Sequence, residues 1–214
     1  MKRIDVEQGT DEWHEARYRK VGGSTSKGLF VKGDTLMINV LSEFLEDFEE
    51  VDNYESPAME RGHELEGPAR KDLSDYTGLD FQDAGWLQCE EIEILGISPD
   101  GITADGRFSC EIKCPGKEKH TRTIIEGIIP LDHVHQCLHY FTVIPELEKH
   151  YFASYRPESD KPLFVKAWTR DSLINLGTKA KPVLKTVDEW VVIAKEHAEE
   201  LHEEIQEHIL NINF

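Results

Sequence analysis

Several stretches of the sequence place an apolar residue at every third or fourth position, which is the spacing of a helix with one buried face. The longest runs from Ser56 to Thr77, where a serine followed by proline is typical of a first helical turn. Thr10 suits the start of a helix that runs to about Lys20, and Ser24 suits the start of a second, short helix. The sequence thus predicts helices over residues 10–20, from residue 24, and over residues 34–50, 56–77, 130–143 and 171–209, the last broken near Pro182.

Shorter apolar segments bounded by turns predict strands, and Pro99 with Gly101 marks a sharp bend between two of them. The predicted strands cover residues 81–88, 92–98, 107–113, 150–155 and 163–169. This order of elements predicts an α/β fold: a mixed central β-sheet flanked by helices, with an N-terminal helical segment and a long C-terminal helix. A chain of 214 residues with 39% hydrophobic content is long enough for one well-buried domain, which we expect to span residues 1–214.

The net charge of −18 argues against a nucleic-acid partner until its distribution is considered. Residues 43–66 hold ten acids against one base, and residues 186–214 hold eight acids against one lysine. The remainder is close to balanced, so a phosphate-binding face is compatible with the composition. Two solvated acidic helix faces explain the same acids equally well.

Two further observations bear on location and redox state. No stretch approaches the roughly 20 apolar residues that span a bilayer, and the N-terminal residues lack the apolar run of a signal peptide, so we expect a cytoplasmic protein without a membrane partner.

The four cysteines form no CxxC pair, and we expect free thiols that pack in the core rather than disulfides or an iron–sulfur cluster. A zinc site at His133, His135 and His139 is disfavoured because residues 133 and 135 diverge on a helix.

Residues 96–117 carry the candidate chemistry. Residues two apart in a strand share a face, so Glu111 and Lys113 should project together while Ile112 points into the core. Asp100, at the neighbouring turn, would bring a second carboxylate close to Glu111, and two such carboxylates are expensive to keep charged without a divalent cation. Magnesium suits oxygen ligands and can activate a bound water. The plain alternative is a surface hairpin with an acid–lysine pair.

These residues resemble the PD-(D/E)xK nuclease core, and specifically its YqaJ or lambda-exonuclease branch. The resemblance covers about residues 7–156 and includes several separate motifs in the family's order. They are Glu7-Gln8-Gly9-Thr10 with Trp13, Arg17 and Gly23-Ser24; Gly62, Glu64, Glu66 and Arg70; Ser98-Pro99-Asp100-Gly101; Glu111-Ile112-Lys113-Cys114-Pro115; and Gln136. The resemblance implies a restriction-endonuclease-like fold.

The resemblance also implies roles for single residues. Asp100, Glu111, the carbonyl of Ile112 and Glu66 would bind Mg²⁺, with Mn²⁺ able to substitute, and Lys113 would assist the attacking water. A 5′-terminal phosphate of DNA would be held by Arg17, Ser24, Ser98 and Gln136.

The implied activity is digestion of one strand of linear double-stranded DNA in the 5′ to 3′ direction, which leaves a 3′ overhang for single-strand annealing. The family also implies a homo-oligomer, often a trimeric ring, and a single-strand annealing protein as partner.

Several alternatives stay open. An endonuclease with the same core is the second enzyme hypothesis, and an acidic protein that mimics DNA is the alternative without catalysis. Glu66 has the spacing of a salt bridge to Arg70. Arg19 or Lys20 has the charge to replace Arg17 in the phosphate pocket. His133 stands where many relatives have a tyrosine, so any contact of that hydroxyl is in question.

Overall fold

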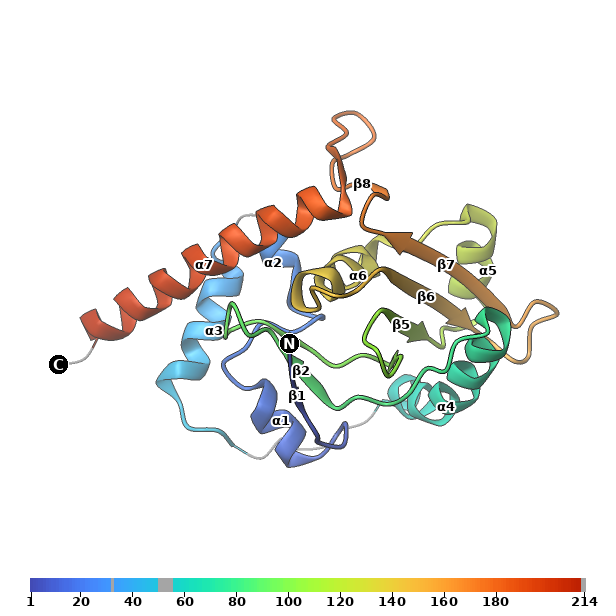
Figure 1. Cartoon of the computed structure of the whole chain (residues 1–214), viewed down its shortest axis with the longest axis horizontal. Helices are drawn as coiled ribbons and strands as arrows, with labels where there is room; N and C mark the ends of the chain where they lie inside the picture. Colours follow the sequence, from blue (N-terminus) through green and yellow to red (C-terminus); the bar gives the residue numbers. More distant parts are fainter. Residues whose placement is uncertain (32, 50–55, 213–214) are drawn as a thin grey trace.

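A four-stranded mixed sheet lies at the centre of the computed structural model, which describes residues 1–31, 33–49 and 56–212. The strand order is β4–β5–β6–β7, and β5 runs parallel to β6 while β4 and β7 are antiparallel to their neighbours (Figure 1). The strands are β4 (Gly101–Ile102), β5 (Phe108–Lys113), β6 (Lys149–Tyr155) and β7 (Leu163–Thr169). A parallel pair needs a crossover connection, and two helices between β5 and β6 supply it.

Helices cover both faces of this sheet. On one face Ile112 packs with Ala69 and Leu73 of α4 (Pro57–Thr77), and on the other α6 (Leu131–Val143) contributes Leu138 and Phe141 to the larger core. The long α7 (Val187–Ile212) packs on α6 and closes that core with Trp190. The mixed sheet with flanking helices and a long C-terminal helix confirms the fold class expected from the sequence.

A second, three-stranded antiparallel sheet has the order β1–β2–β3. Its strands are β1 (Lys2–Ile4), β2 (Trp86–Gln88) and β3 (Gly96–Ile97). The predicted strands 81–88 and 92–98 are therefore shorter than expected, and β1 was not predicted at all. β1 pairs with residues far along the chain and buries little, so its own three residues carry no local signal.

The N-terminal helical segment is confirmed, with different boundaries. Thr10 caps α1 (Asp11–Arg17) by accepting the N–H of Trp13. The helix ends before Lys20 because the backbone becomes extended at Tyr18, and Arg19 follows with a φ of +62°. The prediction that Ser24 starts the second helix was wrong, because α2 (Lys27–Phe30) begins after Ser26. Helix α3 (Thr35–Leu45) follows, and residue 50, the predicted end of that helix, lies outside the described residues.

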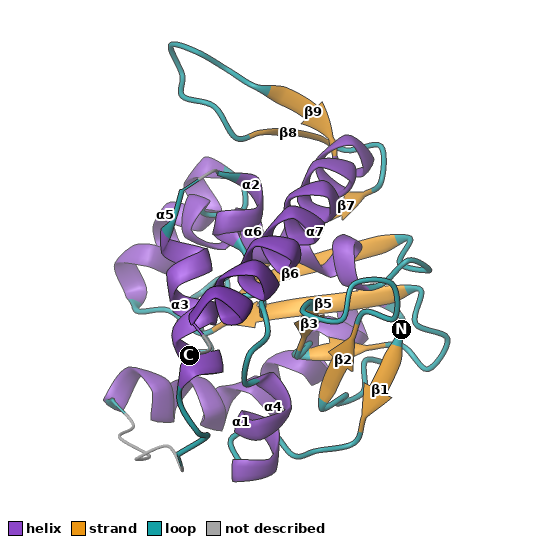
Figure 2. Cartoon of the chain, turned by 90° about the vertical axis from the view of Figure 1, so that its left-hand side faces the viewer, coloured by secondary structure: helices purple, strands orange, loops and turns teal. Residues whose placement is uncertain are grey.

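The prediction of a helix over residues 171–209 was wrong for residues 171–186. A two-stranded hairpin, β8 (Leu173–Asn175) and β9 (Leu184–Thr186), precedes α7 and projects from the body of the protein (Figure 2). The Asn175 side chain accepts the N–H groups of Gly177 and Val183, which gives the backbone an alternative to helical hydrogen bonds.

Helix α5 (Lys117–Glu126) was not predicted from the sequence either. It has few apolar residues, and glycines stand at both of its ends, with Gly127 in the left-handed conformation at its C-cap. The helix is attached to β6 through buried His120, whose ring nitrogens bond the Ser154 hydroxyl and the Lys161 carbonyl, each at 2.8 Å. In the described part of the chain, every helix is too short or too polar to cross a membrane.

Candidate active site

Strand β5 presents Glu111 and Lys113 on one face, as the two-residue period of a strand requires. Their carboxylate and ammonium groups form an ion pair, and the Glu111 side chain is fully buried. Ile112 points to the opposite face, into the cluster beneath α4. The predicted arrangement of these three residues is confirmed.

Asp100 joins this group from the turn before β4. Its Oδ2 accepts the backbone N–H of Ile112 at 2.6 Å, which attaches the Pro99–Asp100 turn to the middle of β5. Burial and the nearby Glu111 carboxylate raise the pKa of Asp100 well above its usual value, while Lys113 acts in the opposite direction. Two carboxylates therefore converge at this point, Glu111 fully buried and Asp100 half-buried.

Lys113 supplies the positive charge closest to this pair. Burial acts to lower its pKa, but the Glu111 and Asp100 carboxylates outweigh burial and raise the pKa above its ordinary value. The ammonium is therefore charged at neutral pH and available to orient a water or an anionic oxygen. Removing it would leave two buried carboxylates without compensation.

The donor set fits a divalent oxygen-seeking cation. Within residues 1–31, 33–49 and 56–212, no three His, Cys, Asp or Glu side chains converge closely enough to enclose a metal by themselves. Magnesium does not need such a cage, because it is commonly held by one or two carboxylates and keeps several waters. Asp100, Glu111 and the carbonyl of Ile112 are the groups that would hold it, and a cation there would relieve the repulsion that raises the pKa of Asp100.

Glu66 reaches the same cavity from α4 but is already paired. Its Oε1 lies 2.7 Å from Nη2 of Arg70, and Arg70 also pairs with Asp83 at 3.2 Å. The salt bridge that the sequence analysis gave as the alternative is therefore present. Glu66 nevertheless lines the cavity together with Asp100 and Lys113, so the pair orients Glu66 beside the candidate metal ligands.

A substitution at Glu66 separates the two roles. If Glu66 supports the metal, Glu66→Gln should weaken cation binding by about tenfold to a hundredfold, the range typical of groups that orient metal ligands. The readouts are Mn²⁺ binding by calorimetry and the Mg²⁺ concentration for half-maximal cleavage. Glu64→Gln, on the exposed side of the same helix, is the matched control. An unchanged metal requirement in Glu66→Gln would favour a purely structural salt bridge.

Tyr140 on α6 completes the environment of Glu111. Its buried hydroxyl donates to Oε2 of Glu111 at 2.6 Å, and burial together with that carboxylate raises the pKa of Tyr140, so the hydroxyl keeps its proton. The ring stacks on buried His150 at 4.1 Å between centroids, and His150 bonds the Ser109 hydroxyl at 2.9 Å. Tyr140 thus fixes the orientation of the Glu111 carboxylate.

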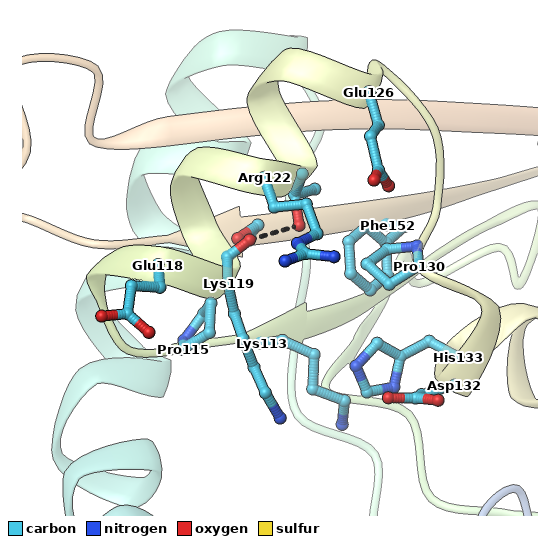
Figure 3. Close-up of a pocket in the computed structure, with 12 residues that line it drawn as sticks. Lys113, Pro115, Glu118, Lys119, Arg122, Glu126, Pro130, Asp132, His133 and Phe152 are labelled. Carbon is cyan, nitrogen blue, oxygen red and sulfur yellow. Dashed lines mark hydrogen bonds between the residues drawn. The ribbon is translucent and has the colours of Figure 1, made fainter.

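A cavity of about 910 Å³ opens in front of these groups, between α4, the end of β5 and α5. Its lining includes Glu66, Asp100, Ile112, Lys113, Lys119 and His133. Lys113, Lys119 and His133 also line an adjoining cavity of about 340 Å³, where Figure 3 shows the two lysine ammonium groups pointing the same way. His133 stacks on Phe152 at 5.5 Å, so the residue that replaces the usual tyrosine is held at the edge of the catalytic cavity.

Arg17, at the end of α1, is held by aromatic rings. Its guanidinium lies 3.8 Å from the centroid of Trp13 and 6.0 Å from that of Trp86, and burial lowers its pKa. Trp86 can approach because residue 96 is glycine: a Cβ there would lie 2.1 Å from the indole ring. Within the described part of the chain the guanidinium has no ion pair, so it remains available to an anion.

Two of the other candidate phosphate ligands, Ser24 and Gln136, lie at the Gly22–Gly23 turn, which Arg17 also approaches. A Cβ on Gly22 would lie 3.8 Å from Nη2 of Arg17, and a Cβ on Gly23 would lie 3.3 Å from Nε2 of Gln136. Ser24 is exposed beside this turn and lines a cavity of about 430 Å³ with Gln136. Arg17 faces a separate cavity of about 400 Å³, so the structure places the residues on two sides of one glycine turn rather than in a single pocket.

Ser98 is connected to Arg17 through Trp13. The indole N–H of Trp13 donates to the Ser98 hydroxyl at 2.6 Å, and that hydroxyl donates to the Gly85 carbonyl at 2.8 Å. Ser98 therefore fixes the ring on which Arg17 stacks.

The two alternative cations have other partners. Arg19 donates to the Glu43 and Glu46 carbonyls at 2.9 and 3.0 Å, and Lys20 pairs with Glu93 at 3.6 Å. Arg17 is thus the candidate that the geometry favours. Its role as a phosphate ligand stays a prediction, as do those of Ser24, Ser98 and Gln136.

The histidines and cysteines considered as possible metal ligands contact other groups of the protein instead. His135 stacks on Phe30, while His139 bonds the carbonyls of Val21 and Gly96, and its pKa falls to about 4 on burial. All four cysteines are free thiols, and Cys89, Cys110 and Cys137 lie in the core.

Two side chains that matter for the site were missed from the sequence. The Tyr140 hydroxyl bonds Glu111, and Lys119 enters the cavity from the unpredicted α5. Helical spacing puts Tyr140 on the same flank of its helix as Gln136, and this was the available signal. The spacing does not identify the partner of the Tyr140 hydroxyl, because that partner depends on how α6 crosses β5. Lys119 had no signal, because the helix that carries it was not predicted.

Comparisons with known proteins identify the family and the fold. The model of the YqaJ-like viral recombinase domain matches residues 12–145. A crystal structure of an alkaline exonuclease, LHK-Exo from Laribacter hongkongensis, is 26% identical with a TM-score of 0.73, over 94% of this chain and 97% of that one. A structure of LHK-Exo in complex with dAMP is 24% identical with a TM-score of 0.77, over 95% of this chain and 96% of that one. Curated proteins gave no match.

The family match extends over more than half of the chain and includes Asp100, Glu111, Lys113 and Gln136. Family and fold together support a nuclease of the lambda-exonuclease type. The chain belongs to the YqaJ-like viral recombinase family.

Proposed function

We propose that this protein is a Mg²⁺-dependent exodeoxyribonuclease. It digests one strand of linear double-stranded DNA in the 5′ to 3′ direction and leaves a 3′ overhang for single-strand annealing in the bacterial cytoplasm. By the same resemblance we propose that it forms a homo-oligomer, a trimeric ring, and works with a single-strand annealing protein.

The observation that carries the proposal is the convergence of Asp100, Glu111 and Lys113 at the wall of a cavity of about 910 Å³, which Asp100 and Lys113 line. A DNA mimic would need surface carboxylates, whereas Glu111 is fully buried. Two inward carboxylates beside one charged lysine have a clear use in hydrolysis of a phosphodiester, where negative charge builds up on the phosphate oxygens.

The chain's own residues have distinct tasks in this reaction. A bound divalent cation would supply the activated water and neutralise charge on the scissile phosphate. Asp100 and Glu111 orient that site, and their orientation is fixed by the Ile112 amide and the Tyr140 hydroxyl. Lys113 stabilises the developing charge, and Lys119 lies close enough to the same cavity to attract the DNA backbone.

Closed circular DNA tests the exonuclease assignment. A covalently closed circle has no terminal phosphate and no end to enter the cavity, so with Mg²⁺ it should stay intact while an equal concentration of end-labelled linear duplex is consumed. Strand polarity follows from labelling the 5′ or the 3′ end separately. Nicking or linearisation of the circle at a comparable rate would replace the exonuclease with an endonuclease.

A further inference from the structure

The β8–β9 hairpin, residues 173–186, forms a projecting arm whose base is firmly held (Figure 2). Ile174 is buried in the main core, and its carbonyl accepts the indole N–H of Trp190 at 3.0 Å. Beyond the paired strands, Asn175 fixes the start and the end of the loop by accepting the N–H groups of Gly177 and Val183 at 3.0 and 2.8 Å. The arm therefore holds a defined direction relative to the body of the protein.

The arm is positively charged in a chain that is strongly negative. Residues 172–187 contain three lysines and no acid, against a net charge of −18 for the whole chain. Lys179 and Lys181 stand in the loop, where residues 178–184 are all exposed. Lys185 lies nearer the base, with its ammonium 5.9 Å from the Trp190 ring. The tip thus offers two cations to a partner.

The base of the arm meets residues assigned to the 5′ end of DNA. Asn175, Leu176 and Gly177 form one wall of the cavity of about 430 Å³ whose other walls include Ser24, Lys27 and Gln136. That cavity and the smaller cavity beside Lys113 lie on two sides of the first turn of α6 and share Asp132. A strand that passes from the catalytic cavity around α6 would therefore run toward the arm.

We propose that the β8–β9 arm is a DNA-binding element that grips phosphates of the duplex through Lys179 and Lys181, next to the end being digested. This assignment rests on the proposed exonuclease function. The arm would hold the substrate between successive cuts without taking part in the chemistry.

A second copy of the chain is the other partner that the arm has the chemistry to contact. Leu173, Val183 and Leu184 are exposed, and acidic α7 of another copy would attract the lysines. The position of the arm favours DNA over a second copy of the chain, because the arm lines one cavity together with Ser24, Lys27 and Gln136. Contacts between copies release no counterions from DNA, so they leave the salt slope of duplex binding unchanged, whereas phosphate contacts steepen it.

The test compares Lys179→Ala/Lys181→Ala with the wild type for duplex binding in Ca²⁺ over a series of salt concentrations. Each duplex phosphate contact contributes about 0.9 to the slope of log affinity against log salt, so the slope should fall by nearly two. Affinity at low salt should fall on the order of tenfold, and the product length per binding event should shorten. The matched control is Lys2→Ala/Lys71→Ala, which removes the same charge from exposed positions on β1 and α4.

Each outcome is decisive. A wild-type slope in the Lys179→Ala/Lys181→Ala variant, or an equal fall in the control, would overturn the arm assignment. A smaller assembly by sedimentation with an unchanged salt slope would make the arm a contact between copies. A wild-type protein that binds duplex ends yet never cleaves them would instead overturn the exonuclease function. The salt slopes of duplex binding would still show whether the arm binds DNA.

Discussion

Asp100→Asn and Glu111→Gln should each abolish cleavage of linear duplex while leaving duplex binding in Ca²⁺ intact. Each change neutralises one of the two carboxylates that would hold the cation, and a metal contributes several kcal/mol of transition-state stabilisation. Because about 1.4 kcal/mol corresponds to a factor of ten, the loss should reach about a thousandfold or more. Binding should survive because the lost charge is negative, like DNA itself. Appreciable cleavage by either variant in Mg²⁺ would refute the metal-site assignment.

The stability of Asp100→Asn without metal provides an independent readout. The pKa of Asp100 is raised in the folded protein, so at neutral pH its ionised form opposes folding, and this penalty disappears as the pH falls below the raised pKa. Asparagine has nearly the same shape as aspartate, and its side-chain oxygen can still accept the Ile112 N–H. Because asparagine is uncharged, the substitution removes the penalty. The thermal midpoint in EDTA should therefore be at least as high as that of the wild type. Mg²⁺ should raise the midpoint of the wild type and not that of the variant.

Strand β5, which carries the candidate catalytic residues, could be predicted from sequence because its signals are local. The two-residue period placed Glu111 and Lys113 together and Ile112 opposite, and the same logic fails for β1, whose pairing depends on residues more than 80 positions away. Helix α4 was predicted well because a serine–proline start and an αL glycine at its end are local signals too. The same reasoning missed α5, which has few apolar residues and is attached to β6 through a buried histidine.

The partners of the site residues could not be predicted, because they depend on tertiary packing. Spacing allowed Glu66 either to pair with Arg70 or to face a metal site. In the folded chain Arg70 holds one oxygen of Glu66, and Glu66 also lines the cavity with Asp100. For Arg17, sequence left two neighbouring cations open. The positive φ of Arg19 turns that side chain toward the carbonyls at the end of α3 and leaves Arg17 stacked on Trp13.

Arg17→Ala should slow digestion of 5′-phosphorylated duplex by roughly tenfold to a hundredfold, the effect of losing one charge-assisted contact of about 1.5–3 kcal/mol in the transition state. A terminal phosphate carries more charge than an internal diester, and a guanidinium can hold it with two parallel hydrogen bonds. The 5′-hydroxyl duplex, already the poorer substrate, should slow much less. Initial rates on both substrates at equal DNA concentration give the comparison.

The ratio of the two rates separates a phosphate ligand from a structural residue, because Arg17 also packs between Trp13 and Trp86. A variant that is only destabilised loses both activities by the same factor. Lys20→Ala is the matched control, since it removes a nearby cation that already pairs with Glu93 and should leave the ratio unchanged. Arg17→Lys keeps the charge without the paired hydrogen bonds and should fall between the wild type and Arg17→Ala. Equal slowing of both substrates by Arg17→Ala, or a wild type indifferent to the phosphate, would remove Arg17 from the pocket while the metal site still stood.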